Sequence, residues 1–316
     1  MAMSIIVSCI NHKGGVGKTT VCAHLGYALA VHHGQRVLLV DFDSQSNLTR
    51  FFYAADAVPL SLTDVFSGAC SVHDIILSPH PNLMLLPASL NLTNIEHTLT
   101  TENNYHALGD VLRPLAGTFD IALIDCPPSL MTMTLNAMSA STDVCIITTT
   151  DRLAIEGIGA IIQAVQQVQQ TRNPFLALSS VVVSHYEQRK AVAREGLAIV
   201  EQYFSSGTVL EPTVPYSVSV QEAIWHTKTV FQHKKSGKAT EAFTDLAKAF
   251  ARRYLPNIQI SPTAAHSTQT NKPKKRATDN KAQKHNAQKH NAQETKQASH
   301  TRAHKATRKT STQAAS

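Results

Sequence analysis

The segment from Ser4 to Leu29 constrains the fold more than any other part of this 316-residue sequence. It begins with a short, apolar, β-branched run, Ser4–Ile10, which is typical of a buried parallel strand. Three glycines follow within KGGVGK, and glycine allows the backbone to turn with positive φ. Apolar residues then recur at helical spacing as far as Leu29. The segment therefore predicts a strand, a tight loop and a helix, in that order.

The loop KGGVGKTT, residues 13–20, has the chemistry of a phosphate-binding loop. Backbone N–H groups of such a loop form a nest for anionic oxygens, and the helix N-terminus adds a positive dipole end. Lys18 is in position to reach β- and γ-phosphates, and the Thr19 hydroxyl to ligate Mg²⁺. The strict template needs glycine where this chain has His12, so the prediction depends on the strand and helix around the loop. The template gives no role to a second lysine, Lys13.

Apolar runs alternate with helical patterns up to about residue 255. The predicted strands are Ser4–Ile10, Arg36–Phe42, Asn82–Pro87, Asp120–Asp125, Asp143–Thr148 and Leu178–Ser184. The predicted helices include Asn104–Arg113, which Pro114 should end, Ile155–Gln170 and Lys238–Tyr254. This alternation predicts an α/β fold, a mostly parallel sheet with helices on both faces, which binds ligands outside the carboxyl ends of its strands.

Two of these strands end in carboxylates. Asp41 and Asp43 lie two residues apart, so on an extended chain they point to one face, and we expect both near the phosphates and Mg²⁺. Asp125 ends FDIALID and has the position of a carboxylate that holds Mg²⁺ through water. Each of them alone could be a solvated strand end. Together with the glycine loop they favour a nucleotide site.

The motifs KGGVGKTT, DFDSQSN and IDCPPSL resemble the deviant-Walker-A ATPases of the ParA/MinD superfamily, and within it the ParA-type partition ATPases. LLPAS at 85–89 and AIEGI at 154–158 are smaller matches, and the resemblance covers residues 4–255. It implies a P-loop ATPase fold, ATP and Mg²⁺ as cofactors, and slow ATP hydrolysis that a partner stimulates.

The resemblance also implies roles for individual residues. Lys13 is the family's additional lysine, which reaches across a nucleotide-sandwich dimer to the partner subunit's phosphates, in the manner of an arginine finger. Lys13, Lys18 and Asp43 are the implied catalytic residues, with Asp43 orienting the attacking water. Thr19, Asp43 and Asp125 are the implied metal residues. The implied nucleotide-binding residues are Lys13, Gly14, Gly15, Val16, Gly17, Lys18, Thr19, Thr20, Pro215 and Tyr216.

The sequence departs from the family pattern at VPYSVSVQEA, residues 214–223. Tyr216 and Ser219 replace two arginines, and Ser217 replaces an asparagine. These changes leave open how the adenine edge is held, and they remove two positive charges from a region that the family presents to DNA. A milder departure is Ser44, where the family usually has proline. The basic residues that remain as candidate DNA contacts in the body are Arg189, Lys190 and Arg194.

Charge divides the chain near residue 256. Residues 257–316 hold 12 Lys and Arg against 2 Asp and Glu, a net charge of +10, whereas residues 1–256 hold 17 against 20, a net charge of −3. The tail has no aromatic residue, so it cannot offset its ordering entropy and is predicted to be disordered. We therefore predict an ATPase domain at 1–256 and a basic low-complexity tail at 257–316. The tail adds the candidate DNA contacts Lys272, Lys274, Lys275 and Arg276.

Other interpretations of the tail stay open. Its KPKKR run resembles a nuclear-import patch, and His285 and His290, which recur in the repeat AQKHNAQKHNAQ, resemble a metal-binding tract. A solubilising tail that weakly attracts DNA is the simplest interpretation.

The resemblance predicts a cytoplasmic, nucleoid-associated ATPase that forms a homodimer with ATP and binds nonspecific DNA. It drives the partitioning of a plasmid or chromosome, and a ParB-like activator bound to that cargo stimulates its ATP hydrolysis. A relative that positions a protein cargo would carry the same motifs. A MinD-like membrane-cycling protein needs a C-terminal amphipathic helix, which HKATRKTSTQAAS does not provide, and no stretch approaches the roughly 20 residues of a membrane span. Five scattered cysteines without a C-x-x-C pair favour buried thiols in a reducing cytoplasm over a metal-cluster carrier.

Overall fold

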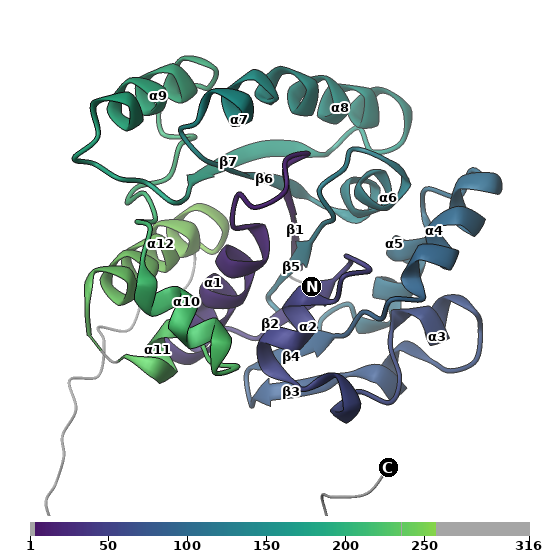
Figure 1. Ribbon diagram of the computed structural model, residues 1–316. Helices are drawn as coiled ribbons and strands as arrows, with labels where there is room; N and C mark the ends of the chain where they lie inside the picture. Colours follow the sequence, from purple (N-terminus) through teal and green to yellow (C-terminus); the bar gives the residue numbers. More distant parts are fainter. Residues whose placement is uncertain (1–3, 235, 257–316) are drawn as a thin grey trace, which may run out of the picture. The chain divides into compact units, whose positions relative to one another are not determined.

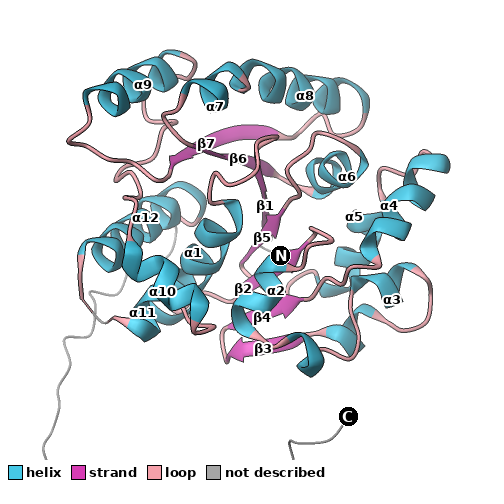
Figure 2. Cartoon of the chain, viewed as in Figure 1, coloured by secondary structure: helices cyan, strands magenta, loops and turns pink. Residues whose placement is uncertain are grey.

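The structure, a computed structural model, describes residues 4–234 and 236–256. The predicted tail at 257–316 lies outside these residues. Figures 1 and 2 show the alternation of strands and helices along the described chain. The strands are β1 (Ile5–Ile10), β2 (Val37–Asp41), β3 (Leu77–His80), β4 (Leu83–Leu86), β5 (Ile121–Asp125), β6 (Asp143–Thr148) and β7 (Ala177–Val183). The helices are α1 (Lys18–His32), α2 (Asn47–Phe52), α3 (Leu62–Phe66), α4 (Leu92–Thr101), α5 (Ala107–Leu112), α6 (Thr132–Ala140), α7 (Arg152–Glu156), α8 (Ile158–Thr171), α9 (Ala191–Gln202), α10 (Val218–Trp225), α11 (Val230–His233) and α12 (Lys238–Tyr254).

All the named strands belong to one sheet, in the order β3-β4-β2-β5-β1-β6-β7. Neighbouring strands run parallel, except that β3 pairs antiparallel with β4 at one edge. The central strand β1 lies between β5 and β6. The strands β2 to β5 lie on one side of it, and β6 and β7 lie on the other, so the strand order reverses direction at β1. The carboxyl end of β1 is therefore the switch point at which a sheet of this kind binds ligands. The predicted α/β fold with a mostly parallel sheet is confirmed.

Helices cover both faces of the sheet, with α1 and α12 on one side and α5 and α6 on the other (Figure 1). The pleat of β2 explains how one strand serves both layers. Val37 and Leu39 pack with α1 and α12, whereas Leu38 and Val40 pack with the opposite layer. All four side chains are fully buried, which is why the strand is apolar throughout rather than alternating.

The predicted helix Ile155–Gln170 was wrong in one respect, because the structure has two helices, α7 and α8, with Gly157 between them. His12 lies at this junction. A Cβ at Gly157 would lie 1.7 Å from Cε1 of His12, so only glycine leaves room for the imidazole ring. The histidine that breaks the strict loop template is thus accommodated by a glycine that is distant in sequence.

The predicted helix Asn104–Arg113 also needs correction. It begins only at Ala107, because the Asn104 side chain accepts a hydrogen bond from the His106 N–H at 3.2 Å and keeps this turn outside the helix. The α-helix ends at Leu112, and Pro114 lies in a 3-10 turn, Arg113–Leu115, that follows it directly. The sequence analysis missed β3, whose Pro79 is tolerated because β3 is an edge strand.

Candidate active site

The loop between β1 and α1 turns through two glycines in the left-handed region. Gly15 has φ of 77° and Gly17 has φ of 85°, values that residues with a Cβ rarely adopt. Gly17 is also the N-cap residue of α1, and no side chain caps this helix end. The first N–H groups of α1 are therefore directed at the space beside the loop.

Two side chains tie the loop to the neighbouring strands β6 and β7. Asn11 Nδ2 donates to the carbonyl of Ile147 in β6 at 2.7 Å, and Asn11 Oδ1 accepts from the Lys13 N–H at 2.9 Å. The Ser184 hydroxyl, just after β7, donates to the carbonyl of Val16. The conformation of the loop thus depends on the sheet as well as on its own glycines.

A cavity of about 530 Å³ opens between the loop and the carboxyl ends of the strands. Lys18 projects into it from the first turn of α1 and is only 7% exposed. Its Nζ lies 3.4 Å from the carbonyl oxygen of Lys13. The lining residues are Gly14, Gly15, Gly17, Lys18, Thr19, Thr20, Asp43, Gln45, Asn47, Arg50, Phe51, Pro128, His185 and Ile224.

The two carboxylates after β2 do not share one role, which corrects the expectation that both face the phosphates. Asp43 lines the cavity, and its Oδ1 accepts from the Gln45 N–H at 3.0 Å. Asp41 is fully buried, and its Oδ2 accepts from both the N–H and the hydroxyl of Thr49 at 2.7 Å. Burial raises the pKa of Asp41 to about 7, against these hydrogen bonds. Asp41 therefore ties β2 to α2.

Asp125 lies beside Asp41, because the two residues are partners in the β2–β5 register. Burial and then the charge of Asp41 raise the pKa of Asp125 to about 8, although a hydrogen bond from Thr19 opposes the shift. Asp125 Oδ2 is buried and has no hydrogen-bond partner among the described residues. An acceptor of this kind fits the outer shell of a hydrated cation, which would favour the ionised carboxylate.

No three His, Cys, Asp or Glu side chains in residues 4–234 and 236–256 converge as a metal site. Where Mg²⁺ accompanies a nucleotide, it is usually held by substrate phosphates and waters with one or two protein carboxylates. The hydroxyl of Thr19, the carboxylate of Asp43 and the unpartnered oxygen of Asp125 fit such an ion.

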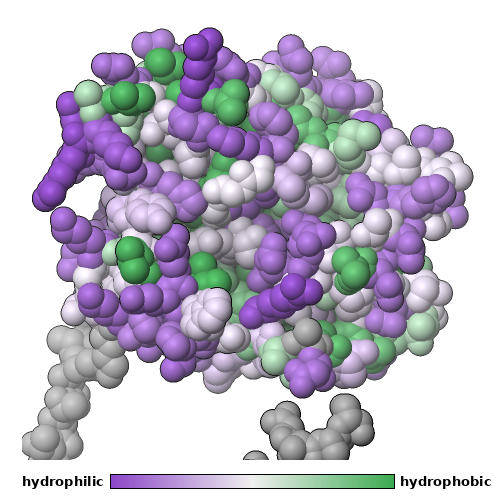
Figure 3. Space-filling view, in the orientation of Figure 1, coloured by the Kyte–Doolittle hydropathy of each residue, from purple (hydrophilic) through white to green (hydrophobic). Residues whose placement is uncertain are grey.

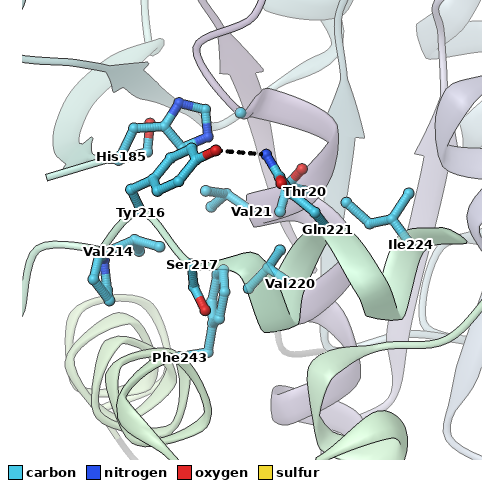
Figure 4. Close-up of a pocket in the computed structure, with 13 residues that line it drawn as sticks. Thr20, Val21, His185, Val214, Tyr216, Ser217, Val220, Gln221, Ile224 and Phe243 are labelled. Atoms are coloured by element: carbon cyan, nitrogen blue, oxygen red, sulfur yellow. Dashed lines mark hydrogen bonds between the residues drawn. The ribbon is translucent and has the colours of Figure 1, made fainter.

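A second cavity, of about 190 Å³, adjoins the first at four residues that line both, Gly17, Thr20, His185 and Ile224. Figure 4 shows its labelled walls, where Val21, Val214, Val220 and Phe243 supply apolar surface. Tyr216 and Pro215 line it as well. The Tyr216 hydroxyl accepts a hydrogen bond from Gln221 Nε2 at 3.0 Å, which fixes the phenol against α10 (Figure 4). An apolar cavity beside the 530 Å³ cavity that the loop and Lys18 line has the form of a nucleotide site. We call the larger one, which has room for a chain of phosphates, the phosphate-sized cavity.

The sequence analysis missed two residues of this site. His185 lines both cavities, contacts the loop at Gly17 and lies edge-on to Tyr216, with ring centroids 6.0 Å apart. It has φ of 52° just after β7, and no sequence signal marks it. Arg50, in α2, brings a positive charge to the phosphate-sized cavity. Its place three residues after Asn47 in DFDSQSNLTR was the available signal.

Lys13 does not line the phosphate-sized cavity. It lines a third cavity, of about 300 Å³, together with Val16 and residues of α9. This cavity adjoins the first at Gly14, Gly15 and His185, which line both. The Lys13 ammonium group forms an ion pair with Asp151, just before α7. The structure therefore brings together all the predicted loop residues except Lys13 and Val16, with Asp43 and Asp125 beside them and Pro215 and Tyr216 in the adjoining cavity.

The candidate DNA contacts of the body lie around the start of α9 and are exposed. Lys190 forms an ion pair with Glu187 at 2.5 Å. Arg194 donates to the carbonyls of Gln188 and Arg189, at 2.9 and 3.2 Å. Two of the three basic side chains are thus partly engaged within the chain. The tail candidates Lys272, Lys274, Lys275 and Arg276 lie outside the described residues.

The surface in Figure 3 is mostly hydrophilic, with hydrophobic patches that include the region over α7 and α9. Leu153 in α7 and Val192 in α9 are 66% and 73% exposed. In the part of the chain that the structure describes, no helix combines the length and the apolar character needed to cross a membrane.

Known proteins are similar to this chain in sequence and in fold. Residues 4–178 match the family described as AAA domain. The chromosome-partitioning ATPase Soj of Treponema pallidum is 32% identical over 246 residues, which cover 77% of this chain and 96% of Soj. The chromosome partitioning protein ParA of Caulobacter vibrioides is 32% identical over 253 residues, covering 78% of this chain and 94% of ParA. Cobyrinic acid a,c-diamide synthase of Mycobacterium smegmatis, solved with bound ADP and magnesium, is 32% identical with a TM-score of 0.69, covering 84% of this chain and 100% of that chain.

The family match, residues 4–178, includes the β1–loop–α1 unit and the carboxyl ends of β2 and β5. The similarity to Soj and ParA extends over nearly the whole length of those two partition proteins. The chain therefore belongs to the ParA/Soj family of partition ATPases, within the ParA/MinD superfamily of P-loop ATPases.

Proposed function

We propose that this protein is an ATPase that dimerises with ATP, binds nonspecific DNA in that state, and partitions a plasmid or chromosome with a ParB-like activator bound to the cargo. The partition names of Soj and ParA support the cellular role. The proposal assigns catalysis to Lys13, Lys18 and Asp43, and Mg²⁺ to Thr19, Asp43 and Asp125. Nucleotide binding is assigned to Lys13, Gly14, Gly15, Val16, Gly17, Lys18, Thr19, Thr20, Pro215 and Tyr216.

The position of Lys13 is the observation that carries this proposal. Lys18 occupies the phosphate-sized cavity of its own chain, whereas the Lys13 side chain lies outside that cavity and is 31% exposed. A lysine in this position contributes little to the nucleotide of its own subunit. It is available to a second copy that approaches across the loop, and a positive charge supplied in trans stabilises the charge that develops on transferring phosphate.

Apolar surface beside Lys13 supports the same dimer. Leu153 and Val192 lie on the helices next to the Lys13 cavity and are largely exposed. Exposed apolar patches next to functional residues are typical of protein interfaces. A second copy of the chain would bury this surface and at the same time bring its own phosphates to Lys13.

The chain's own residues would then act as follows. Lys18 balances the charge of the β- and γ-phosphates inside the cavity, where little water screens it. Asp43 accepts a hydrogen bond from the attacking water and orients it. ATP with Mg²⁺ supplies the phosphoryl group. A second copy that covers the cavity would keep other water away from the reaction.

Lys13→Ala tests the proposal. ATP should bind with unchanged affinity, because the Lys18 cavity is intact, while ATP-dependent dimerisation and hydrolysis should both fall. Sedimentation with a slowly hydrolysed ATP analogue measures the dimer, and calorimetry measures ATP binding. Lys248→Ala, which removes a surface lysine paired with Asp245 at 2.8 Å, is the matched control. A Lys13→Ala dimer as tight as wild type would refute action in trans.

DNA binding is proposed to rest on Arg189, Lys190 and Arg194 together with the tail residues Lys272, Lys274, Lys275 and Arg276. The tail's charge of +10 outweighs the body's −3, so removing residues 257–316 should weaken DNA binding strongly. For every DNA phosphate that the shortened chain no longer neutralises, the slope of log K against log salt should become shallower by roughly 0.9. The full chain and residues 1–256 should be compared with ATP, with ADP and without nucleotide. Equal DNA affinity and an equal salt slope for the two chains would show that the tail does not contribute to DNA binding.

The alternative, a ParA-like ATPase that positions a protein cargo, differs in its cargo and can use the same ATP-dependent DNA binding. Isolating the partner that stimulates ATP hydrolysis, and testing whether that partner binds DNA, separates the two. The leading proposal implies a cytoplasmic, nucleoid-associated protein with no membrane partner. Fluorescence microscopy of the tagged full chain would show it on the nucleoid when Asp43→Ala blocks hydrolysis, and dispersed when Lys18→Ala blocks nucleotide binding.

A further inference from the structure

His185 lies where the three cavities of the site meet. It lines the 190 Å³ cavity, the phosphate-sized cavity and the 300 Å³ cavity that Lys13 also lines. A nucleotide whose base occupies the first cavity and whose phosphates occupy the second holds its ribose at their junction, because the sugar links the two. We propose that His185 binds this ribose through a hydrogen bond to its 2′- or 3′-hydroxyl. The inference rests on the nucleotide binding proposed above.

Few side chains at this junction can bond a hydroxyl group. The 190 Å³ cavity and the phosphate-sized cavity share Gly17, Thr20, His185 and Ile224. Glycine and isoleucine have no polar side-chain atom, which leaves Thr20 and His185. Thr20 belongs to the first turn of α1, on the phosphate side. His185 therefore has the position and the chemistry for a contact with the sugar.

The imidazole of His185 is available to a ligand. Its ring lies beside Tyr216, edge-on with centroids 6.0 Å apart (Figure 4), and its Nε2 lies 3.4 Å from the point where a Cβ on Gly17 would be. Across residues 4–234 and 236–256 its two ring nitrogens form no hydrogen bond. The ring that faces the junction thus keeps its full hydrogen-bonding capacity.

The charge of the ring favours a sugar over a phosphate as its partner. Burial lowers the pKa of His185 below 6.5, so the imidazole is neutral at neutral pH. A neutral imidazole has one N–H donor and one acceptor nitrogen, and a sugar hydroxyl can serve as the partner of either. The same ring brings no positive charge to a phosphate. Lys18 already supplies that charge inside the phosphate-sized cavity.

The backbone on both sides of His185 fixes its place. The Ser184 N–H donates to the Thr148 carbonyl at 2.8 Å, and the Tyr186 N–H donates to the Val214 carbonyl at 2.9 Å. Between these two anchors His185 has φ of 52°, in the left-handed region that residues with a Cβ rarely adopt. Glycine fits such a backbone without this strain, so the imidazole can be removed here without breaking the fold.

Nucleotides that lack one hydroxyl give the sharpest test. Wild type should bind ATP roughly two- to tenfold more tightly than the one of 2′-deoxyATP and 3′-deoxyATP that lacks the bonded hydroxyl, the range of one neutral hydrogen bond. His185→Phe keeps a ring beside Tyr216 but cannot form this bond. It should bind ATP roughly two- to tenfold more weakly than wild type, and should bind ATP and both deoxy analogues equally. Calorimetric titration measures each affinity.

One ligand and two variants make the result specific. Tripolyphosphate has no ribose and should bind wild type and His185→Phe equally. His185→Gly relieves the left-handed backbone, so it should unfold in urea as wild type does and yet lose ATP affinity as His185→Phe does. His97→Phe is the matched control. It changes an exposed histidine on α4 that is not among the residues lining these cavities, and it should bind every ligand like wild type.

Two outcomes would overturn the role of His185. One is equal binding of ATP and both deoxy analogues by wild type, and the other is a preference for ATP that persists in His185→Phe. If Thr20→Val removes the preference and His185→Phe does not, Thr20 holds the ribose instead. These failures differ from a failure of the proposed function, in which wild type would not bind ATP or Lys18→Ala would bind it as tightly as wild type.

Discussion

On the phosphate side of the site, Lys18, Thr19 and Thr20 follow one another in a single motif at the start of α1, whereas on the base side His185, Tyr216 and Phe243 come from three distant segments. The phosphate side depends on backbone N–H groups and on glycines, whose positions are set by a few neighbouring residues. The base side depends on side chains that meet only after β7, the segment before α10 and α12 have packed. The first can therefore be recognised as a motif and the second cannot.

The phosphate side should be the more sensitive of the two. Lys18→Ala removes the buried ammonium group that faces the cavity, and ATP affinity should fall by about 100-fold or more, since a hydrogen bond to a charged group is worth roughly 1.5–3 kcal/mol and burial strengthens it. Calorimetric titration with ATP measures the loss, with Lys248→Ala as control. Wild-type affinity in Lys18→Ala would remove the assignment of the phosphate side.

Asp43→Ala should separate binding from hydrolysis within the same cavity. Asp43 lines the cavity at the end of β2, so its loss should leave ATP binding intact while slowing hydrolysis by about 100-fold, the lower range for a positioned acid–base group. Phosphate release gives the rate, and sedimentation should show a long-lived ATP dimer. Asp245→Ala, which removes a surface carboxylate, is the control. A wild-type rate would mean that another group orients the water.

His24 is buried in α1 and should give folding a pH dependence. Its Nδ1 bonds the Thr20 carbonyl at 2.8 Å, and its Nε2 accepts from the Val230 N–H at 2.9 Å, so the ring must be neutral. Burial lowers the pKa of His24 from 6.5 to about 4. Between these values the unfolded chain binds more protons, so folding stability should fall as pH drops from 6.5 toward 4.

Urea unfolding at pH 7 and pH 5 measures this effect, and His24 should account for a loss of about 2 kcal/mol between the two conditions. His24→Gln cannot take up a proton, and its amide oxygen can still accept from the Val230 N–H. This variant should be less stable than wild type at pH 7 and should lose less stability on acidification. An identical pH dependence in both proteins would show that His24 does not set it.

The base side should give the smallest effect. Tyr216→Ala removes a ring that is 51% exposed over the 190 Å³ cavity, and ATP affinity should fall roughly two- to tenfold, the range of one aromatic contact. Binding of tripolyphosphate, which has no base, should not change. Tyr216→Phe keeps the ring and should stay close to wild type for ATP. An equal loss for ATP and tripolyphosphate would show that Tyr216 acts on the phosphate side.

The sequence alone determined the layered α/β architecture and most of the phosphate side. Short apolar runs rich in β-branched residues favour buried strands, and the strands were predicted to within a residue or two, apart from the edge strand β3. The glycine loop, Lys18, Thr19, Asp43 and Asp125 lie at the ends of those runs, and the ends of parallel strands meet at one edge of the sheet. Spacing along the chain was sufficient information for these residues.

Tertiary structure alone decided the rest. Asp41 and Asp43 look equivalent in sequence, yet Thr49 draws Asp41 into the core and leaves only Asp43 at the cavity. The pairing of Lys13 with Asp151, and the place of His185 beside Gly17, likewise join residues that lie far apart in the chain. Such contacts depend on how β6 and β7 pack against the loop, and no local sequence pattern predicts which distant residues will meet there. The residues that match a motif were therefore readable from the sequence, and the residues that position them were not.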